Sequence, residues 1–472
     1  MKALIIAAGK GHRLRKNDDN QPKPLYKVAG LPLIERVILS SKKAGITEFV
    51  IVIGFKGDEI RNHLVRKQKS LGVSIEFVTN EEWEKSNGHS VLKAKEHLND
   101  NFVLLMSDHV FDWNILADFI KRQPLEGQIL LAVDRRTDAI FDPEDATKVK
   151  TGDEVIVRIG KELPEFDAID TGIFHCSPGL IPALEKACAT GKGSLSEAIQ
   201  ILADQGKART FTIGNRFWQD VDTPSSLKIA EQALLCATRK PETDGFIARH
   251  LNRRVSSFIS RLLVKTPVSP NQVTWSALAV GLLSSFLVST GVYWKVALGG
   301  VLFQFASIYD GCDGEVAKLK MASTKYGEWL DTTSDSVTYI VFLIAVMVGA
   351  HRQGSINLLP LSALTLFGAA MALFAMFYCL VKFTDSGSLV TVQKELYRDM
   401  EAFQQNILVR LVSKVRFMMK RDFFALFFMT LCLFNRLEGI LIWAAIGTNL
   451  TWIVLLTVKR EFTEKSPALQ ED

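Results

Sequence analysis

The chain has 472 residues, enough for two or three ordinary domains, and a formal net charge of only +5. Lysine and arginine exceed aspartate and glutamate by about one up to residue 240 and by about four beyond it, which argues against nucleic acid as a main partner. The six cysteines form no C-x-x-C pair and no metal-ligand spacing, so no disulfide framework is expected and a reducing cytoplasm is the natural setting.

The first half of the chain alternates short apolar runs with charged helical stretches. The run that begins at Met1 is too short for a signal peptide and predicts a buried first strand. Helices are predicted at Leu33–Ala44 and Gly57–Lys69. The alternation favours an α/β Rossmann-like domain over residues 1–237, with a parallel sheet covered on both faces. The predicted strands are Ala3–Ala7, Glu48–Ile53, Ser74–Val78, Phe102–Met106, Gln128–Ala132 and Arg209–Ile213.

A glycine-rich turn follows the first strand. It contains Gly9 and Gly11, and two cations follow at Arg13 and Lys23. Such a turn presents backbone N–H groups to phosphates, and the cations add positive charge. The alternative interpretation is a tight strand–helix connection that binds nothing.

Two acidic motifs continue this pattern. Asp108 comes directly after a predicted strand, and Asp222 lies in a D-V-D-T-P stretch. Each alone could be a strand-end residue or a helix N-cap. In this order behind the glycine turn, the two carboxylates predict a metal site. We interpret His89 and His109 as satisfied core or surface residues rather than catalytic groups.

The sequence pattern changes at the polar stretch Thr238–Thr243, which predicts a linker over residues 238–245. Residues 246–265 then predict an amphipathic helix that lies at a membrane surface, and an ordinary surface helix is the alternative. Its apolar side carries Phe246, Ile247, Leu251, Val255, Phe258, Ile259, Leu262 and Leu263, with Arg249, Arg253, Arg254 and Arg261 among the other positions.

Apolar blocks of about 16–25 residues fill most of the remaining chain, near the length that crosses a bilayer. They predict an all-α, six-helix transmembrane domain over residues 266–460 and a polar tail over 461–472. Lysine and arginine gather before the first span, after the second, before the fifth and after the sixth. We therefore expect a multi-pass protein of the cell membrane, with both termini and the active sites on the cytoplasmic side. The predicted spans are 273–293, 295–320, 329–350, 355–382, 422–435 and 438–457.

Acidic residues occupy the second and third predicted spans in helical register. Four carboxylates near hydrocarbon would repel one another, and divalent cations resolve this because hard oxygen ligands suit Mg²⁺ or Mn²⁺. Two such metals can clamp a diphosphate. Gly314 and Gly327 would let a nucleotide approach the backbone closely. Two sets each share a helical face: Asp310, Asp313 and Ala317, then Gly327, Asp331 and Asp335.

This spacing resembles the motif of the CDP-alcohol phosphotransferase family, and the resemblance covers about residues 245–460. It implies that Asp335 also acts as the base toward an acceptor hydroxyl. One departure is Lys318, where the family usually has arginine, so a bidentate contact is lost. Pro270-Asn271 and Arg421-Asp422 are similar to family features as well. The implied metal ligands are Asp310, Asp313, Asp331 and Asp335, and the implied nucleotide contacts are Gly314, Ala317, Lys318 and Gly327.

The first half resembles the nucleotidyltransferases that activate sugar-phosphates with a nucleoside triphosphate. The stretch from Arg15 to Asp18 departs from many relatives, which have a proline and a threonine there. The resemblance implies catalytic cations at Arg13 and Lys23 and metal ligands at Asp108 and Asp222. It implies nucleotide contacts at Ala7, Ala8, Gly9, Gly11, Asn87, Gly88 and Ser90, and contacts to the phosphorylated alcohol at Lys161, Thr171 and Gly172.

The order of both halves resembles the bifunctional inositol-1-phosphate cytidylyltransferase and di-myo-inositol phosphate phosphate synthase family. The resemblance implies that CTP and inositol 1-phosphate give CDP-inositol, whose phosphoinositol group passes to a second inositol 1-phosphate with release of CMP. It implies Mg²⁺ or Mn²⁺ as cofactor, membrane lipid as a partner, and allows a homodimer through the transmembrane domain. Two alternatives stay open: a lipid hydroxyl as the acceptor, or a soluble half that only binds nucleotide or docks.

Overall fold

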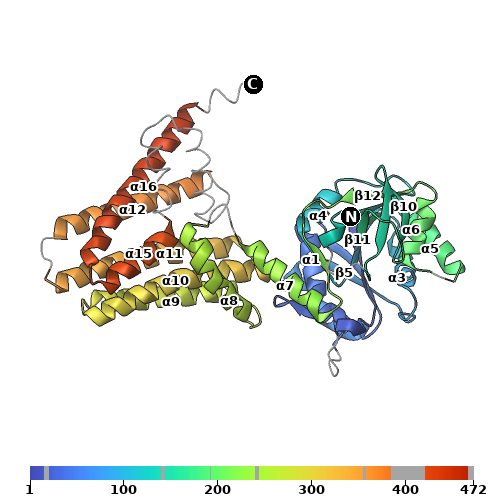
Figure 1. Cartoon of the computed structure of the whole chain (residues 1–472), viewed down its shortest axis with the longest axis horizontal. Coiled ribbons are helices and arrows are strands. Elements are labelled where there is room, and N and C mark those ends of the chain that lie inside the picture. Colours follow the sequence, from blue (N-terminus) through green and yellow to red (C-terminus); the bar gives the residue numbers. More distant parts are fainter. Residues whose placement is uncertain are drawn as a thin grey trace. The chain divides into compact units, whose positions relative to one another are not determined.

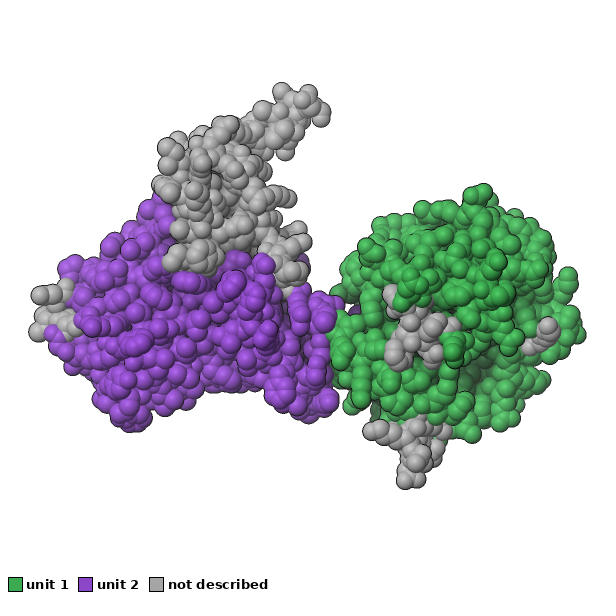
Figure 2. Space-filling model, in the orientation of Figure 1, with its two compact units in different colours: residues 1–234 green, residues 235–472 purple. Residues whose placement is uncertain are grey.

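The computed structural model describes residues 1–14, 21–139, 144–191, 193–239, 244–354, 358–383 and 420–465. The chain forms two compact units, residues 1–234 and 235–472, which Figure 2 colours separately. Several predicted features lie outside the described residues: the departure at 15–18, the centre of the linker at 240–243, much of the basic stretch before the fifth span, and the end of the tail.

The first unit is built on a nine-stranded sheet of order β5-β4-β1-β6-β11-β8-β12-β10-β9. All six predicted strands are confirmed within two residues. Along β1, Ile5 lies between Ile51 of β4 and Leu105 of β6. The strands are β1 Lys2–Ala7, β4 Glu48–Ile53, β5 Ser74–Thr79, β6 Phe102–Met106, β8 Ile129–Asp134, β9 Lys148–Gly152, β10 Val155–Gly160, β11 Ala168–Cys176 and β12 Ala208–Thr212.

The prediction of a parallel sheet is correct for β5-β4-β1-β6 and for the β8–β12 pair and wrong elsewhere, because β11 runs antiparallel to both β6 and β8. Strands β9 and β10 are also antiparallel. Only Asp153 and Glu154 separate them, both with positive φ, and so short a connection can join only antiparallel neighbours.

Helices cover both faces of this sheet, as Figure 1 shows. Successive β1 side chains enter different cores: Leu4 belongs to one buried cluster and Ile5 to the other. The predicted α/β class is therefore confirmed. One face carries α1 Leu33–Lys43, α2 Gly57–Leu71 and α4 Trp113–Phe119, and the other carries α3 Asn87–Lys93, α5 Leu180–Ala189 and α6 Leu195–Ala203.

Short elements at the carboxyl edge of the sheet carry the polar side chains of this unit. Strand β7 (His109–Phe111) pairs antiparallel with β13 (Trp218–Asp220), which sets His109 opposite Asp220. The remaining short elements are the 3₁₀ turns η1 His12–Leu14, η2 Lys23–Leu25, η3 Lys95–His97 and η4 Thr137–Ala139, the pair β2 Lys27–Val28 and β3 Leu31–Pro32, and helix α7 Pro224–Thr238.

The described part of the second unit is helical. The predicted amphipathic helix is present as a π-helical turn followed by α8, and six longer helices coincide with the six predicted spans. Their bounds are η5 Ala248–Asn252, α8 Arg253–Leu263, α9 Pro270–Ser289, α10 Tyr293–Leu319, α11 Lys325–Arg352, α12 Leu359–Phe383, α15 Arg421–Leu433 and α16 Leu437–Lys465.

Four of these helices, α9, α11, α12 and α16, are long and apolar enough to cross a membrane. Helix α15 has 13 residues, which corresponds to about 20 Å and is shorter than a bilayer core of about 30 Å. Helix α10 is long, but its C-terminal part carries Asp310, Asp313, Glu315 and Lys318. Length and composition therefore support four spans and leave the predicted six as a proposal.

Small residues let the bundle helices approach one another closely. A Cβ on Gly349 of α11 would lie 2.4 Å from the carbonyl of Val288 on α9, and one on Gly300 of α10 would lie 2.4 Å from Cys432 on α15. Close helix contact through small residues is typical of membrane proteins. The core between α10 and α11 contains the stacked rings of Phe303 and Phe342, whose centroids are 3.8 Å apart.

Candidate active sites

The predicted glycine turn positions a lysine at the carboxyl end of β1. Gly11 has φ +58°, and a Cβ there would lie 2.5 Å from Cβ of Lys23. Only glycine fits both the backbone conformation and the space. The side chain of Lys23 thus passes beneath the turn and is 6% exposed.

Three carboxylates surround the Lys23 ammonium. Its Nζ donates to Asp108 Oδ2 at 2.5 Å and to Asp222, and lies 3.9 Å from Asp220. Burial lowers the pKa of Lys23, but these carboxylates outweigh the burial and raise that pKa above its ordinary value. The same ammonium and His109 hold the pKa of Asp108 at about 2 despite its burial. Lys23 therefore carries its charge at neutral pH.

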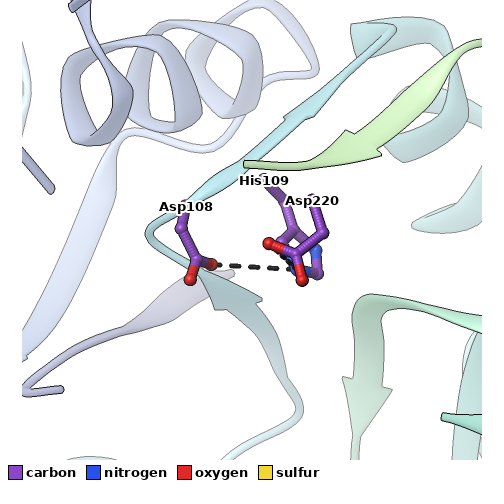
Figure 3. A group of neighbouring side chains, drawn as sticks. All are labelled: Asp108, His109 and Asp220. Carbon is purple, nitrogen blue, oxygen red and sulfur yellow. Dashed lines mark ion pairs between the residues drawn. The ribbon is translucent and has the colours of Figure 1, made fainter. Parts of the chain in front are cut away.

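His109 lies between two of these carboxylates (Figure 3). Its Nε2 is 3.7 Å from both Asp108 and Asp220. Its Nδ1 donates to the carbonyl of Thr171 at 2.8 Å. Burial lowers the pKa of His109, and the two carboxylates reverse that effect and raise it. Burial also raises the pKa of Asp220 to about 7, with Asp108 adding to this and His109 opposing it.

A cavity of about 200 Å³ adjoins this group. Arg13 contributes a guanidinium that pairs with Asp222 and, at 2.5 Å, with Asp145. Asp145 also accepts from Lys161 at 2.7 Å. The cavity is lined by the predicted residues Arg13, Asn87, Lys161, Gly172 and Asp222, together with His109, Asp145, Asp170 and Asp220.

Other predicted contact residues are engaged in hydrogen bonds or close packing within the fold. Thr171 is fully buried and donates to the carbonyl of Ala132, and its own carbonyl accepts from His109. Ser90 is buried and bonded to Asn80. A Cβ on Gly88 would lie 2.4 Å from the carbonyl of Gly193. These contacts support the shape of the turn and the cavity. Ala7 and Ala8 are likewise buried at the end of β1.

In the second unit, three of the predicted aspartates meet. Asp310 and Asp313 of α10 and Asp331 of α11 each offer a carboxylate oxygen, and these oxygens lie within 4.8 Å of one another. The predicted register of the two helices explains the meeting, because each set occupies one helical face. Asp313 is further held by Thr274 of α9, whose Oγ1 donates to its Oδ2 at 2.5 Å.

This site also contains an arginine, Arg421, which the sequence indicated only weakly. Nη1 of Arg421, the first residue of α15, donates to Asp310 Oδ2 at 2.7 Å and also to Asp335. Asp335 therefore faces a cation, one helical turn beyond Asp331. The sequence signal for Arg421 is its position at the start of an apolar block, in the pair Arg421-Asp422. No local pattern connects Arg421 with Asp335, which is 86 residues away.

Two cavities adjoin the aspartates from different directions. The first, of about 170 Å³, is lined by α9, α10 and α11 and contains all the predicted nucleotide contacts. The Lys318 ammonium at its edge donates to the carbonyl of Thr238 at 3.0 Å. Its lining includes Asn271, Thr274, Asp313, Gly314, Ala317, Lys318, Gly327 and Asp331.

The second cavity, of about 210 Å³, begins at Asp335 and Arg421 and continues between α11, α12, α15 and α16. Its walls are mostly apolar, with Phe424, Phe428 and Trp443 among them. Asp335 is thus accessible from a side of the site that does not contain the nucleotide contacts.

The donor sets in both sites fit a divalent cation. Asp108, His109 and Asp220 offer two carboxylates and an imidazole within 4.8 Å, and Asp310, Asp313 and Asp331 offer three carboxylates. All-oxygen sets suit Mg²⁺ and Mn²⁺. In the first unit this group includes the predicted ligand Asp108, while the predicted ligand Asp222 contacts Lys23 and Arg13; the predicted pair stays a proposal.

Two family descriptions match the chain: nucleotidyl transferase over residues 2–236 and CDP-alcohol phosphatidyltransferase over residues 267–451. A curated bifunctional IPC transferase and DIPP synthase from Aquifex aeolicus is 35% identical over 375 residues, which cover 79% of this chain and 82% of that protein. Its namesake from Rubrobacter xylanophilus is 35% identical over 353 residues, 74% of this chain and 78% of that protein. The chain belongs to the bifunctional IPC transferase and DIPP synthase family.

Membership of the IPC transferase and DIPP synthase family confirms the predicted resemblance and the prediction of a bifunctional nucleotidyltransferase and CDP-alcohol phosphotransferase. A third member, from Archaeoglobus fulgidus, is 32% identical over 371 residues, 79% of this chain and 70% of that protein. A solved inositol-1-phosphate CTP transferase from T. maritima is 29% identical over 49% of this chain and 93% of that protein, with a TM-score of 0.45.

Proposed function

We propose that the chain makes CDP-inositol from CTP and inositol 1-phosphate and then transfers the phosphoinositol group to a second inositol 1-phosphate, releasing CMP. The observation that carries this proposal is the presence of two separate sites on one chain, each with an acidic group of metal-binding geometry beside a cavity and a cationic side chain. The product of the first site is the donor that the second requires.

In the first reaction the phosphate of inositol 1-phosphate attacks the α-phosphorus of CTP, and pyrophosphate leaves. No protein nucleophile is needed. Lys23 and Arg13 stabilise the negative charge that develops on the phosphates, while Lys161 binds the phosphate of the incoming alcohol. A bound Mg²⁺ would add charge stabilisation at Asp108, as this chemistry requires. Since Lys23 now neutralises Asp108 and Asp222, binding of cation and triphosphate would free its ammonium for phosphate.

In the second reaction the acceptor hydroxyl attacks the phosphorus of CDP-inositol that bears inositol, and CMP leaves. We assign Asp335 as the base that takes the hydroxyl proton, because it adjoins the cavity opposite the nucleotide contacts. Asp310, Asp313 and Asp331 would hold the metal and thereby the diphosphate. Lys318 adds charge at the nucleotide side. Arg421 would orient Asp335 and attract the phosphate of the acceptor.

The membrane arrangement belongs to the same proposal. Six spans, counting α10 and α15 with the four long apolar helices, would set the aspartates near one membrane face. The exposed apolar residues Phe246, Phe258 and Leu262 of the η5–α8 region support contact with membrane lipid. The lysine and arginine distribution supports a cytoplasmic site. Single-cysteine variants should be labelled from outside the cell at 351–354 and not at 320–326, and the reverse pattern would overturn this orientation.

Product analysis tests the function. Purified protein incubated with CTP, Mg²⁺ and labelled inositol 1-phosphate should release pyrophosphate, form CDP-inositol and then form the phosphodiester of two inositol phosphates. Asp108→Ala should abolish the first step and leave transfer from supplied CDP-inositol intact. If the Asp108 variant also fails to use supplied CDP-inositol, the division of labour is wrong.

A lipid hydroxyl is the second candidate acceptor, and the cavity beside Asp335 favours it. Hydroxyls in its wall are already engaged with carbonyls of their own helices: Thr338 with Ser334 at 2.8 Å and Thr448 with Ala444 at 2.7 Å. Such walls offer few polar partners to a polyol and suit an apolar chain. Supplying inositol 1-phosphate and diacylglycerol-type alcohols in competition decides between the two, since the labelled product partitions into water or into solvent.

A further inference from the structure

The amphipathic helix α8 is joined to the aspartate-bearing helix α10 by a buried ionic network. Arg253 donates through Nε and Nη2 to Asp244, at 2.9 and 2.8 Å, and through Nη1 to Glu315 of α10, at 2.8 Å. Glu315 is 1% exposed and also accepts from Ser256 at 2.8 Å. A surface helix bound only by apolar contacts would not need these directional bonds.

The chain just before α8 is fixed at a second point. Asp422 of α15 accepts from the backbone N–H of Ala248 at 2.7 Å. A Cβ on Gly245 would lie 2.3 Å from Asp422, so the absence of a side chain there lets the carboxylate reach the first helical turn. A carboxylate at a helix N-terminus is favourable, because the first N–H groups of a helix lack partners.

Both anchors are sequence neighbours of active-site residues. Glu315 follows Asp313 by two residues, and Asp422 follows Arg421 directly. Successive helical residues are about 100° apart, so Glu315 lies on nearly the opposite face of α10 from Asp313. The segment therefore contacts α10 on the face away from Asp313 and contacts α15 at the residue next to Arg421.

We propose that residues 244–263, which we name the brace, position α10 against α15, and that Arg253, Glu315 and Asp422 are positioning residues for the transfer reaction. None of the three lines either cavity beside the aspartates. The brace fixes the separation between Asp313, on the metal side, and Arg421 with Asp335, on the acceptor side. This inference rests on the proposed function.

The buried charges of Arg253 and Glu315 depend on each other. Oε2 of Glu315 has no hydrogen-bond partner among the described residues, so this carboxylate relies on Arg253 and Ser256. Removing Arg253 leaves the buried Glu315 carboxylate without its cation. Removing both charges avoids this part of the penalty, although Asp244 still loses its bonds to Arg253. The pair must consequently act as a unit, and neutralising the second partner should recover part of what neutralising the first one loses.

The experiment measures both reactions of the full-length protein in detergent, with supplied CDP-inositol for the second. Arg253→Gln should lower the turnover of transfer by about 10–100-fold, and raise the Mg²⁺ concentration for half-maximal transfer, because supporting residues of metal sites have effects of this size. CDP-inositol formation should stay unchanged and reports that the first unit is folded. The double variant Arg253→Gln, Glu315→Gln should transfer faster than Arg253→Gln alone.

Matched controls make the outcome decisive. Arg254→Gln removes an exposed arginine from the same helix and should change neither reaction. Arg253→Lys keeps the charge and should retain more transfer than Arg253→Gln. The brace is refuted if Arg253→Gln and Glu315→Gln leave turnover and Mg²⁺ dependence at wild-type values, or if both reactions fall in parallel in each variant. Absence of transfer in the wild-type protein would instead overturn the proposed function.

Discussion

The sites of the first and the second unit both bring several carboxylates close together, but they build this arrangement from different elements. Each gathers carboxylates around a cationic side chain: the buried Lys23 in the first unit and the half-buried Arg421 in the second. In the first unit the carboxylates come from loops and short strands far apart in sequence. In the second they come from two helices in register. A site built from helices in register can therefore be predicted from residue spacing. For a site assembled from loops, the sequence indicates only the separate motifs and not how they combine.

The two sites differ most at Asp335, which we propose as a proton acceptor, whereas the first reaction as proposed needs no such carboxylate. Asp335→Asn keeps the shape and cannot take a proton, so turnover of transfer should fall by about 10²–10⁴-fold, with CDP-inositol affinity little changed. Asp310→Asn should weaken metal and nucleotide binding together. Single-turnover transfer and metal-dependent binding of CDP-inositol separate the two. If Asp335→Asn loses nucleotide binding as fully as Asp310→Asn, it is another metal ligand and the base lies elsewhere.

Lys23 tests whether the buried cation of the first site acts in catalysis as well as in stability. Lys23→Met should lower CDP-inositol formation by about 10²–10³-fold, the size expected for a lost electrostatic stabiliser. It also leaves three carboxylates without their ammonium, so Mg²⁺ should raise the heat resistance of this variant more than that of the wild type. Lys10→Met changes an exposed lysine of the same turn and should do neither. Equal stabilisation of all three proteins by Mg²⁺ would contradict the neutralisation of these carboxylates by Lys23.

Gly172 tests how tightly the fold holds His109. Its φ is +71°, and a Cβ would lie 2.2 Å from the His109 ring. Gly172→Ala should therefore destabilise the first unit by about 1–3 kcal/mol and reduce CDP-inositol formation, while transfer from supplied CDP-inositol is retained. Gly160→Ala is the matched control, since a Cβ there has no atom within 4 Å among the described residues. Heat inactivation of each reaction measures the difference.

The smallest expected effect concerns Asp170, where burial raises the pKa to about 6. Its folded-state pKa exceeds the ordinary carboxyl value, so the stability it contributes is present below about pH 4 and is lost as pH rises toward 6. Asp170→Asn should remove this loss and stabilise the unit at pH 7.5 by on the order of 1 kcal/mol. A shift of one pKa unit corresponds to about 1.4 kcal/mol, and the partial exposure of Asp170 reduces this contribution. Heat inactivation at pH 4.5 and 7.5 measures this, with the exposed Asp100→Asn as control. An unchanged pH dependence in Asp170→Asn would contradict the assignment.

Local rules explain what could be predicted. The strands β4 and β6 appear with the predicted bounds, because an apolar run bounded by polar residues is a local signal. The direction of β11 could not be predicted, since it depends on which neighbours the strand meets. Arg253 is the clearest failure of pattern reasoning: it was expected among the polar positions of an amphipathic helix, and it is paired with Asp244 and Glu315 with 17% of its side chain exposed.

By itself, the sequence determined the α/β character of the first unit, the apolar helices of the second and the shared faces of the membrane aspartates, because strand and helix periodicity are properties of neighbouring residues. Only the tertiary structure decided which cation neutralises which carboxylate. Lys23 meets Asp222 across 199 residues, and Arg421 meets Asp310 across 111. Such pairs depend on how whole elements pack, and buried charges take whichever partner that packing brings within reach.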